Sequence, residues 1–167
     1  MAVRQLIGVV GLIVLSACSS LPDGLKSSDA KSAKLTDRLA PRDLTQGECG
    51  IFVWTADAAR RFVFFSQATD PTASWWSGSS EQTVQRISSD GLTAFEQSPV
   101  QTFGLADGGA LKVSLSNPEE VDNGTRFRSG AITQTGPDGW EKVMPVFGVA
   151  ACNVRPVGAQ YSMRTIR

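Results

Sequence analysis

From residue 47 onward, short runs of β-branched and aromatic residues alternate with explicit turn signals. Asn-Gly and Asp-Gly pairs tolerate the positive φ angles that tight hairpin turns require, so they mark where strands reverse. No stretch between residues 47 and 157 sustains a helical period of apolar residues, and the region is therefore predicted to be all-β. The turn signals are Asp90-Gly91, Asp107-Gly108-Gly109, Asn117-Pro118, Asn123-Gly124 and Gly136-Pro137-Asp138-Gly139.

The strand candidates between these turns are short and numerous. About eight to ten short strands within about 110 residues predict a small antiparallel β-barrel or sandwich. The first two candidates flank "ADAA" and are predicted to form a hairpin. The candidates are residues 49–55, 60–67, 74–76, 83–87, 92–95, 100–104, 110–116, 125–128, 130–135, 140–144 and 147–154.

The first hairpin contains two nearly continuous apolar runs, "IFVW" and "RRFVFF", which do not alternate cleanly. Strands of this kind meet apolar groups on both faces. One face is expected to line the domain core. The other is expected to lie under the chain before the domain together with the tail of residues 155–167, and a partner protein is the alternative.

The N-terminus has the pattern of a secretory signal. Arg4 is the single charge in residues 1–5, and an apolar run from Leu6 to Leu15 follows it. A transmembrane helix needs about 20 apolar residues, and this run ends well short of that at Ser16. The segment is therefore predicted to be a signal peptide rather than a permanent span.

The end of this signal, Leu15-Ser16-Ala17-Cys18, resembles the lipobox of bacterial lipoprotein precursors at all four positions. The resemblance implies a diacylglyceryl group on the Cys18 thiol, cleavage after Ala17 and acylation of the new amino group. Two or three acyl chains hold a protein on a membrane far better than one. In enteric bacteria an aspartate after the cysteine retains a lipoprotein in the inner membrane. Ser19 therefore favours the outer membrane, with the domain facing the periplasm. A plain secretory signal with an incidental cysteine is the alternative.

The segment between Cys18 and the β domain is rich in Ser, Ala, Lys and Asp and is predicted to be a flexible tether. A coil of about 28 residues has a root-mean-square span of roughly 30 Å, enough to lift a domain clear of lipid headgroups. A short helix over Asp29–Ala40 is the alternative. The predicted parts are a signal peptide (1–17), the lipid-anchored tether (18–46), the β domain (47–157) and a C-terminal tail (158–167).

With Cys18 assigned to lipid, Cys49 and Cys152 remain as an even pair. In an oxidising compartment such a pair is typical of a disulfide. Closing a loop of about a hundred residues would stabilise the fold by up to about 4 to 5 kcal/mol in the chain-entropy model. Zinc binding by the two thiols is the alternative, but two thiols without any histidine do not fill a tetrahedral zinc site.

The absence of histidine from the whole sequence excludes Ser-His-Asp and Cys-His nucleophilic sites and the usual zinc and iron sites. Glu119, Glu120 and Asp122 are interpreted as solvated residues of a turn-rich loop, rather than as a glycosidase pair or a calcium site. No phosphate-binding or dinucleotide motif is present. We therefore expect a protein that is not an enzyme and needs neither cofactor nor metal.

The charge of the chain argues against nucleic acid as a partner. Loss of residues 1–17 removes one of the 16 basic residues and none of the 16 acidic ones, so the mature chain is close to neutral. No cluster of Lys and Arg stands out along the sequence, whereas nucleic-acid binding needs a basic patch.

Trp75 and Trp76 are the candidate binding residues. Neighbouring residues of a strand point to opposite faces, so one indole is expected to enter the core and the other to face outward. An exposed indole can stack on a sugar ring or anchor a protein interface. In the alternative, the tether or the tail covers the outer ring.

Two classes of function remain open. The first is a lipid-anchored envelope lipoprotein that acts as a non-catalytic binding or structural module for an envelope protein or a cell-wall glycan. The second is an inhibitor, because a lipobox followed by a small cysteine-clipped β-barrel resembles the membrane-bound inhibitors of c-type lysozyme. In that family a Ser-x-Ser-Gly-Ala-like loop reaches the lysozyme active site, and "SSDGL" at 88–92 loosely resembles it.

Metabolic labelling with a lipid precursor tests the predicted anchor. The wild-type chain is expected to carry the label and Cys18→Ala to lose it, because the diacylglyceryl group attaches to that thiol. Cys49→Ala serves as the matched control and is expected to keep the label. Continued labelling of Cys18→Ala would contradict the assignment.

Overall fold

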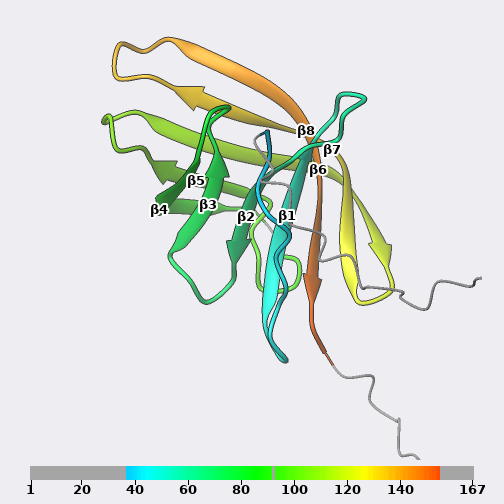
Figure 1. Cartoon of the computed structure of the whole chain (residues 1–167). Helices are drawn as coiled ribbons and strands as arrows, with labels where there is room; N and C mark the ends of the chain where they lie inside the picture. The colour runs from blue at the N-terminus through cyan, green and yellow to red at the C-terminus, as the bar shows by residue number, and fades with distance from the viewer. Residues whose placement is uncertain (1–36, 92, 155–167) are drawn as a thin grey trace, which may run out of the picture. The chain divides into compact units, whose positions relative to one another are not determined.

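The computed structural model describes residues 37–91 and 93–154, which form a closed antiparallel barrel of eight strands (Figure 1). Each strand pairs with the next along the chain, and the last returns to pair with the first. This confirms the all-β prediction and selects a barrel over a sandwich. The strands are β1 (Cys49–Thr55), β2 (Phe62–Gln67), β3 (Thr72–Trp76), β4 (Glu81–Asp90), β5 (Val100–Gly104), β6 (Ala110–Val121), β7 (Gly124–Thr135) and β8 (Glu141–Cys152). Within the described residues, no helix is long and apolar enough to cross a membrane.

The barrel closes where β1 pairs with β8. Their register runs from Cys49 opposite Cys152 to Thr55 opposite Val146. A disulfide joins Cys49 and Cys152 at one end of this ladder, as the sequence predicts. The covalent link therefore ties the first strand to the last across the closing seam, and neither strand is left with an unpaired edge.

Hydrophobic side chains fill the inside of the barrel. An eight-stranded barrel is just wide enough for its own side chains to occupy the interior. The rings of Phe64 and Phe103 pack edge to face with centroids 5.2 Å apart, and both side chains are fully buried. We call this set the inner cluster; it comprises Ile51, Val53, Val63, Phe64, Ala73, Trp75, Val84, Phe103, Leu111, Val113, Leu115, Phe127, Ile132, Val146 and Ala150.

A β-bulge in β2 explains why its sequence does not alternate. Val53 pairs with Phe64, but the next residue of β1, Trp54, pairs with Phe62, so Val63 is an extra residue in the ladder. Val63 and Phe64 consequently both belong to the inner cluster, although they are neighbours in the chain. Phe62, one residue earlier, lies on the outer wall.

The outer face of the first hairpin lies partly under residues 37–46. Leu39 is only 1% exposed and packs against Phe62 and Phe65. Its amide donates a hydrogen bond of 2.8 Å to the carbonyl of Phe62. Further along, the side chain of Asn153 donates to the carbonyl of Leu44 at 2.7 Å. A covering segment before the domain is therefore present, and the expected boundary at residue 47 falls too late, because the last ten residues assigned to the tether pack on the barrel.

We call the apolar residues of this face the outer cluster: Leu39, Phe62 and Phe65, with Leu44, Phe52, Trp54 and Trp76 packed against them. The other segment considered as a cover, residues 155–167, lies outside the described residues, as does most of the possible helix over Asp29–Ala40. The described part of that helix, residues 37–40, is not helical.

Four local predictions were wrong. The runs 125–128 and 130–135 fall on one continuous strand, β7, and the runs 140–144 and 147–154 fall on one continuous strand, β8. The run 92–95 is not a strand in its described part, because Ala94 and Gln97 bond to each other across a tight turn whose central residues, Phe95 and Glu96, have φ angles of 50° and 60°. Likewise Asn117-Pro118 does not reverse the chain. Strand β6 continues through it, with Asn117 at a φ of 54°, because the ladder with β7 resumes at the next residue.

Leu39→Ala tests whether residues 37–46 belong to the folded domain. The free energy of unfolding is expected to fall by about 2–5 kcal/mol, as it does when a buried leucine is truncated. Chemical denaturation of the full chain measures it. Leu44→Ala is the matched control and is expected to cost less, because Leu44 is only half-buried. Equal stability of Leu39→Ala and the wild type would contradict the packing.

Candidate functional site

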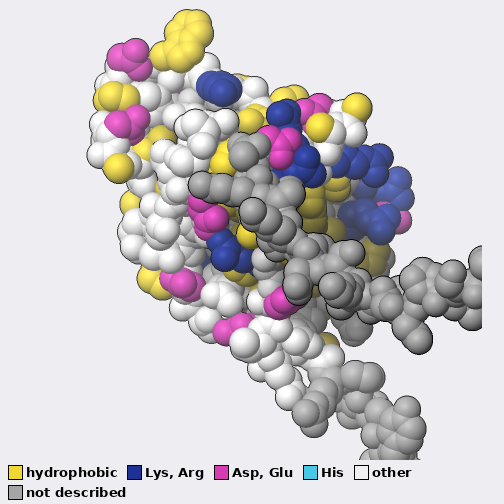
Figure 2. Space-filling view, in the orientation of Figure 1, with side chains coloured by type: hydrophobic (Ala, Val, Ile, Leu, Met, Phe, Trp, Pro, Cys, Tyr) yellow, Lys and Arg dark blue, Asp and Glu magenta, His cyan; other side chains and the backbone are white. Residues whose placement is uncertain are grey.

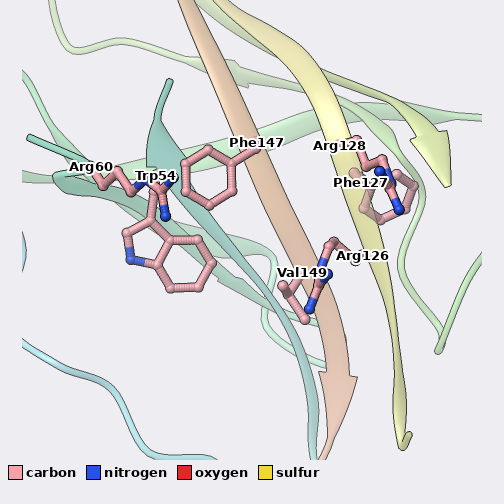
Figure 3. A pocket seen from close by; sticks show the side chains of 7 residues that line it. All are labelled: Trp54, Arg60, Arg126, Phe127, Arg128, Phe147 and Val149. Carbon is pink, nitrogen blue, oxygen red and sulfur yellow. The ribbon is translucent and has the colours of Figure 1, made fainter. Parts of the chain in front are cut away.

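Basic side chains gather on the outer wall of the barrel, over the β6–β7 hairpin and beside hydrophobic surface (Figure 2). At this place a groove of about 790 Å³ crosses β1, β8 and β7. We call it the arginine-aromatic groove, after the residues that line it (Figure 3). They are Trp54, Arg60, Arg126, Phe127, Arg128, Phe147 and Val149.

One row of paired residues runs across the groove. Phe52 of β1 pairs with Phe65 of β2 on one side and with Val149 of β8 on the other. Val149 pairs with Arg126 of β7, and Arg126 pairs with Glu119 of β6. Directly paired side chains lie on the same face of a sheet, so this row passes along the outer wall from apolar to charged residues.

A second row of paired residues forms the floor of the groove. We call Trp54 and Phe147 in this row the aromatic floor. Trp54 pairs with Phe62 on one side and with Phe147 on the other. The rings of Trp54 and Phe147 stack with centroids 5.8 Å apart and planes 16° apart, and both are half-buried. Phe62 packs against Trp54 at 5.4 Å and belongs to the covered side. The covered outer cluster thus continues into an open aromatic surface.

A bulge in β7 helps to position the arginines of the groove. Phe127 pairs with Gly148, but the next pair along β7 joins Gly130 to Val146, so β7 has one residue more than β8 between these two pairs. Bulges bend a strand and redirect its side chains. Phe127 points into the inner cluster, while Arg128 is exposed on the outer wall.

The arginines of the groove are only partly neutralised. Arg128 binds both carboxylate oxygens of Glu119, with Nε–Oε2 and Nη2–Oε1 distances of 2.9 and 2.7 Å. Arg126 lies farther off, with Nη1 at 3.8 Å from the same carboxylate. The guanidinium of Arg60 sits 5.9 Å from the centre of the Phe147 ring and makes no ion pair within residues 37–91 and 93–154. Arg126 and Arg128 thus share the Glu119 carboxylate, and Arg60 has no carboxylate partner among the described residues.

The ion pair changes the titration of both its members. Hydrogen bonding to Arg128 lowers the pKa of Glu119 below its ordinary value, and the bond to Glu119 raises the pKa of Arg128. A lowered carboxylate pKa means that the pair stabilises the fold above the ordinary glutamate pKa, and that this contribution disappears as the pH falls through the lowered one. The pair is therefore intact at neutral pH.

The predicted tryptophan site lies elsewhere. Trp75 is 2% exposed and belongs to the inner cluster, so it is the ring that enters the core. Trp76 is half-buried and packs against both the inner cluster and the outer cluster, close to the covering Leu39. The two indoles do point to different faces, and neither lines the arginine-aromatic groove.

The remaining predicted site residues have separate positions. Cys18 lies outside the described residues, and the Cys49–Cys152 disulfide lies at the closing seam. Glu119 and Glu120 were expected in a turn-rich loop, which is wrong, because both lie in β6, where Glu119 binds Arg128. Among the described residues, no three His, Cys, Asp or Glu side chains are grouped as metal ligands would be.

Sequence reasoning missed the groove because its residues come from distant parts of the chain. The one local signal is Arg126-Phe127-Arg128, since residues two apart on a strand share a face. Trp54 and Phe147 meet only because β1 and β8 pair at the closing seam.

Comparison of the chain with family models, with curated proteins and with solved structures finds no match in any of the three. The function of the groove is therefore inferred from its own chemistry: guanidinium donors beside aromatic faces, which suit a partner both anionic and apolar.

Arg128→Gln tests the electrostatics of the groove. The pKa of Glu119 is expected to rise toward its ordinary value, because the hydrogen bond that stabilises the carboxylate is lost. NMR titration of the Glu119 carboxyl carbon measures the change. Arg60→Gln removes a charge that does not touch Glu119, and is expected to leave the midpoint in place. A midpoint unaltered by Arg128→Gln would contradict the ion pair.

Proposed function

We propose that this chain is a lipid-anchored lipoprotein of the bacterial envelope whose barrel is a non-catalytic binding module. Its partner, an envelope component, binds on the outer wall at the arginine-aromatic groove. The observation that carries this proposal is the contrast between the two sides of the sheet. The inside is filled by the inner cluster, whereas the outside holds an open groove lined by Trp54, Phe147 and three arginines.

The filled interior argues against a carrier of small ligands. Barrels that carry ligands keep room inside for them, at the mouth or at the centre. Here Phe64, Phe103 and Trp75 occupy the middle of the barrel and are at most 2% exposed. Binding is therefore assigned to the outer wall, where aromatic and arginine side chains are the residue types most common at binding hot spots.

The lipobox resemblance at Cys18 supports the location. Acyl chains on that residue would hold the barrel at the membrane, with the outer membrane favoured by Ser19. An anchored domain meets other envelope proteins at a high effective concentration. A groove of modest affinity is then sufficient for function.

The alternative, a lysozyme-inhibitor-like lipoprotein, has less support. The residues that resemble the inhibitory loop are mostly in a strand: Ser88, Ser89 and Asp90 belong to β4 and pair with Thr102, Gln101 and Val100 of β5. Of the five-residue motif only Gly91 follows the strand within the described residues. No projecting loop built from these serines supports the inhibitor proposal.

Photo-crosslinking in cells tests the proposed function. A photoreactive phenylalanine analogue at Phe147 is expected to trap a discrete envelope partner, because that ring lines the groove. The same analogue at Val143 is the control, since Val143 is 58% exposed on β8 and does not line the groove. The control is expected to give no discrete product.

Besides the absence of any trapped partner, two results would contradict the proposal. One is a partner trapped from Val143 and not from Phe147. The other is inhibition of a c-type lysozyme by the purified chain that persists in a Trp54→Ala, Phe147→Ala variant, which would favour the inhibitor alternative.

A further inference from the structure

The chemistry of the arginine-aromatic groove points to one class of partner. We propose that it binds an extended acidic peptide segment of an envelope protein, in which an apolar side chain lies between carboxylates. The inference rests on the proposed function, since it names the partner of the same groove.

The floor of the groove suits an inserted side chain. Trp54, Phe147 and Val149 are all half-buried, and they lie side by side across the β1–β8 seam. A hollow of this kind receives a group that projects from its partner. The flat surface of a bilayer would need apolar side chains that stand out from the wall. The hollow shape therefore favours a peptide over a membrane surface as the occupant.

The surrounding arginines select carboxylates. Guanidinium groups bind carboxylates through two parallel hydrogen bonds, which gives both strength and direction. Within the described residues, the guanidinium groups of Arg60 and Arg126 make no hydrogen bond; the side chain of Arg60 lies over Phe147, and Arg126 has only its 3.8 Å approach to Glu119. The Arg60 side and the Arg126 side of the aromatic floor each have donors for one carboxylate of a partner.

Glu119 shows how such a carboxylate binds. It accepts hydrogen bonds from Nε and Nη2 of Arg128 at 2.9 and 2.7 Å, and it lies near Arg126 as well. The chain's own carboxylate thus holds the place that a partner's carboxylate would take. Removing the Glu119 carboxylate leaves Arg126 and Arg128 available to a carboxylate of the partner. Loss of Glu119 is therefore expected to strengthen binding of the acidic peptide.

The experiment uses a fluorescent ten-residue peptide of alternating glutamate and leucine, added to the full chain in mild detergent. Fluorescence anisotropy measures the dissociation constant. The acidic peptide is expected to bind at least tenfold more tightly than the same peptide with glutamine in place of glutamate. Its affinity is also expected to fall as salt is added, because salt screens the exposed charges.

Glu119→Gln is the decisive variant, and Glu120→Gln is its matched control. Glu119→Gln is expected to tighten binding of the acidic peptide at least threefold. Glu120 is the next residue of β6, so its side chain points to the other face of the strand, and it makes no ion pair among the described residues. Glu120→Gln changes the net charge equally and is expected to leave the affinity unchanged. Thermal unfolding of each variant confirms that it is folded.

Equal binding of the acidic and glutamine peptides would overturn the inference, as would equal effects of Glu119→Gln and Glu120→Gln. So would a phosphatidylglycerol-dependent change in the tryptophan fluorescence of the chain in vesicles that is lost in Trp54→Phe, because it would assign the groove to lipid headgroups. A partner trapped in cells from position 147 without any dependence on acidic residues would leave the proposed function standing and refute only the partner class. Absence of a trapped partner would refute the proposed function itself.

Discussion

The pairing of β1 with β8 is the constraint on which the rest of this structure depends. It joins the first strand to the last over the whole length of β1, and the Cys49–Cys152 disulfide fixes one end of that ladder. Once the sheet is closed, every strand residue has a defined inside or outside position. Ile51 and Val53 then enter the filled core, while Phe52 between them faces outward. A closed sheet also has no free edge to pair with another chain, so recognition is left to side chains.

Closure also creates the apolar stripe on the outer wall. Aromatic rings of β1, β2 and β8 form one continuous row of ring contacts there, through Phe65, Phe52, Trp54 and Phe147. One end of this row is buried under Leu39, and the other end is open beside the arginines. A contiguous apolar surface with a polar border is typical of an interaction site on a small protein. The arginines add a preference for anionic groups, which an apolar stripe alone would lack.

Local patterns in the sequence predict much of the fold. The first hairpin, the run 100–104 and the turn at Asn123-Gly124 are all present, and the disulfide follows from the two remaining cysteines. The prediction fails where tertiary contacts override local preference. Asn117-Pro118 is absorbed as an irregularity of a long strand, because β7 continues to pair on both sides of it. In the sequence, Leu39 is one of the scattered leucines of the predicted tether. Only the fold shows that it packs on the outer face of β2.

The candidate site was less predictable than the fold. Its aromatic floor joins Trp54 to Phe147, and no local pattern shows that residues so far apart in the chain become neighbours. The two tryptophans are adjacent in the sequence, yet packing places Trp75 in the core and Trp76 against the outer cluster. Hydroxyl-radical footprinting, in cells and on the purified chain, tests most directly whether the outer groove is where a partner binds. Trp54 and Phe147 should be oxidised less in cells than in the purified chain, while Trp140, 77% exposed and outside the groove, should be oxidised equally in both. Equal oxidation of Trp54 and Phe147 in the two samples, or protection confined to Trp140, would contradict the account.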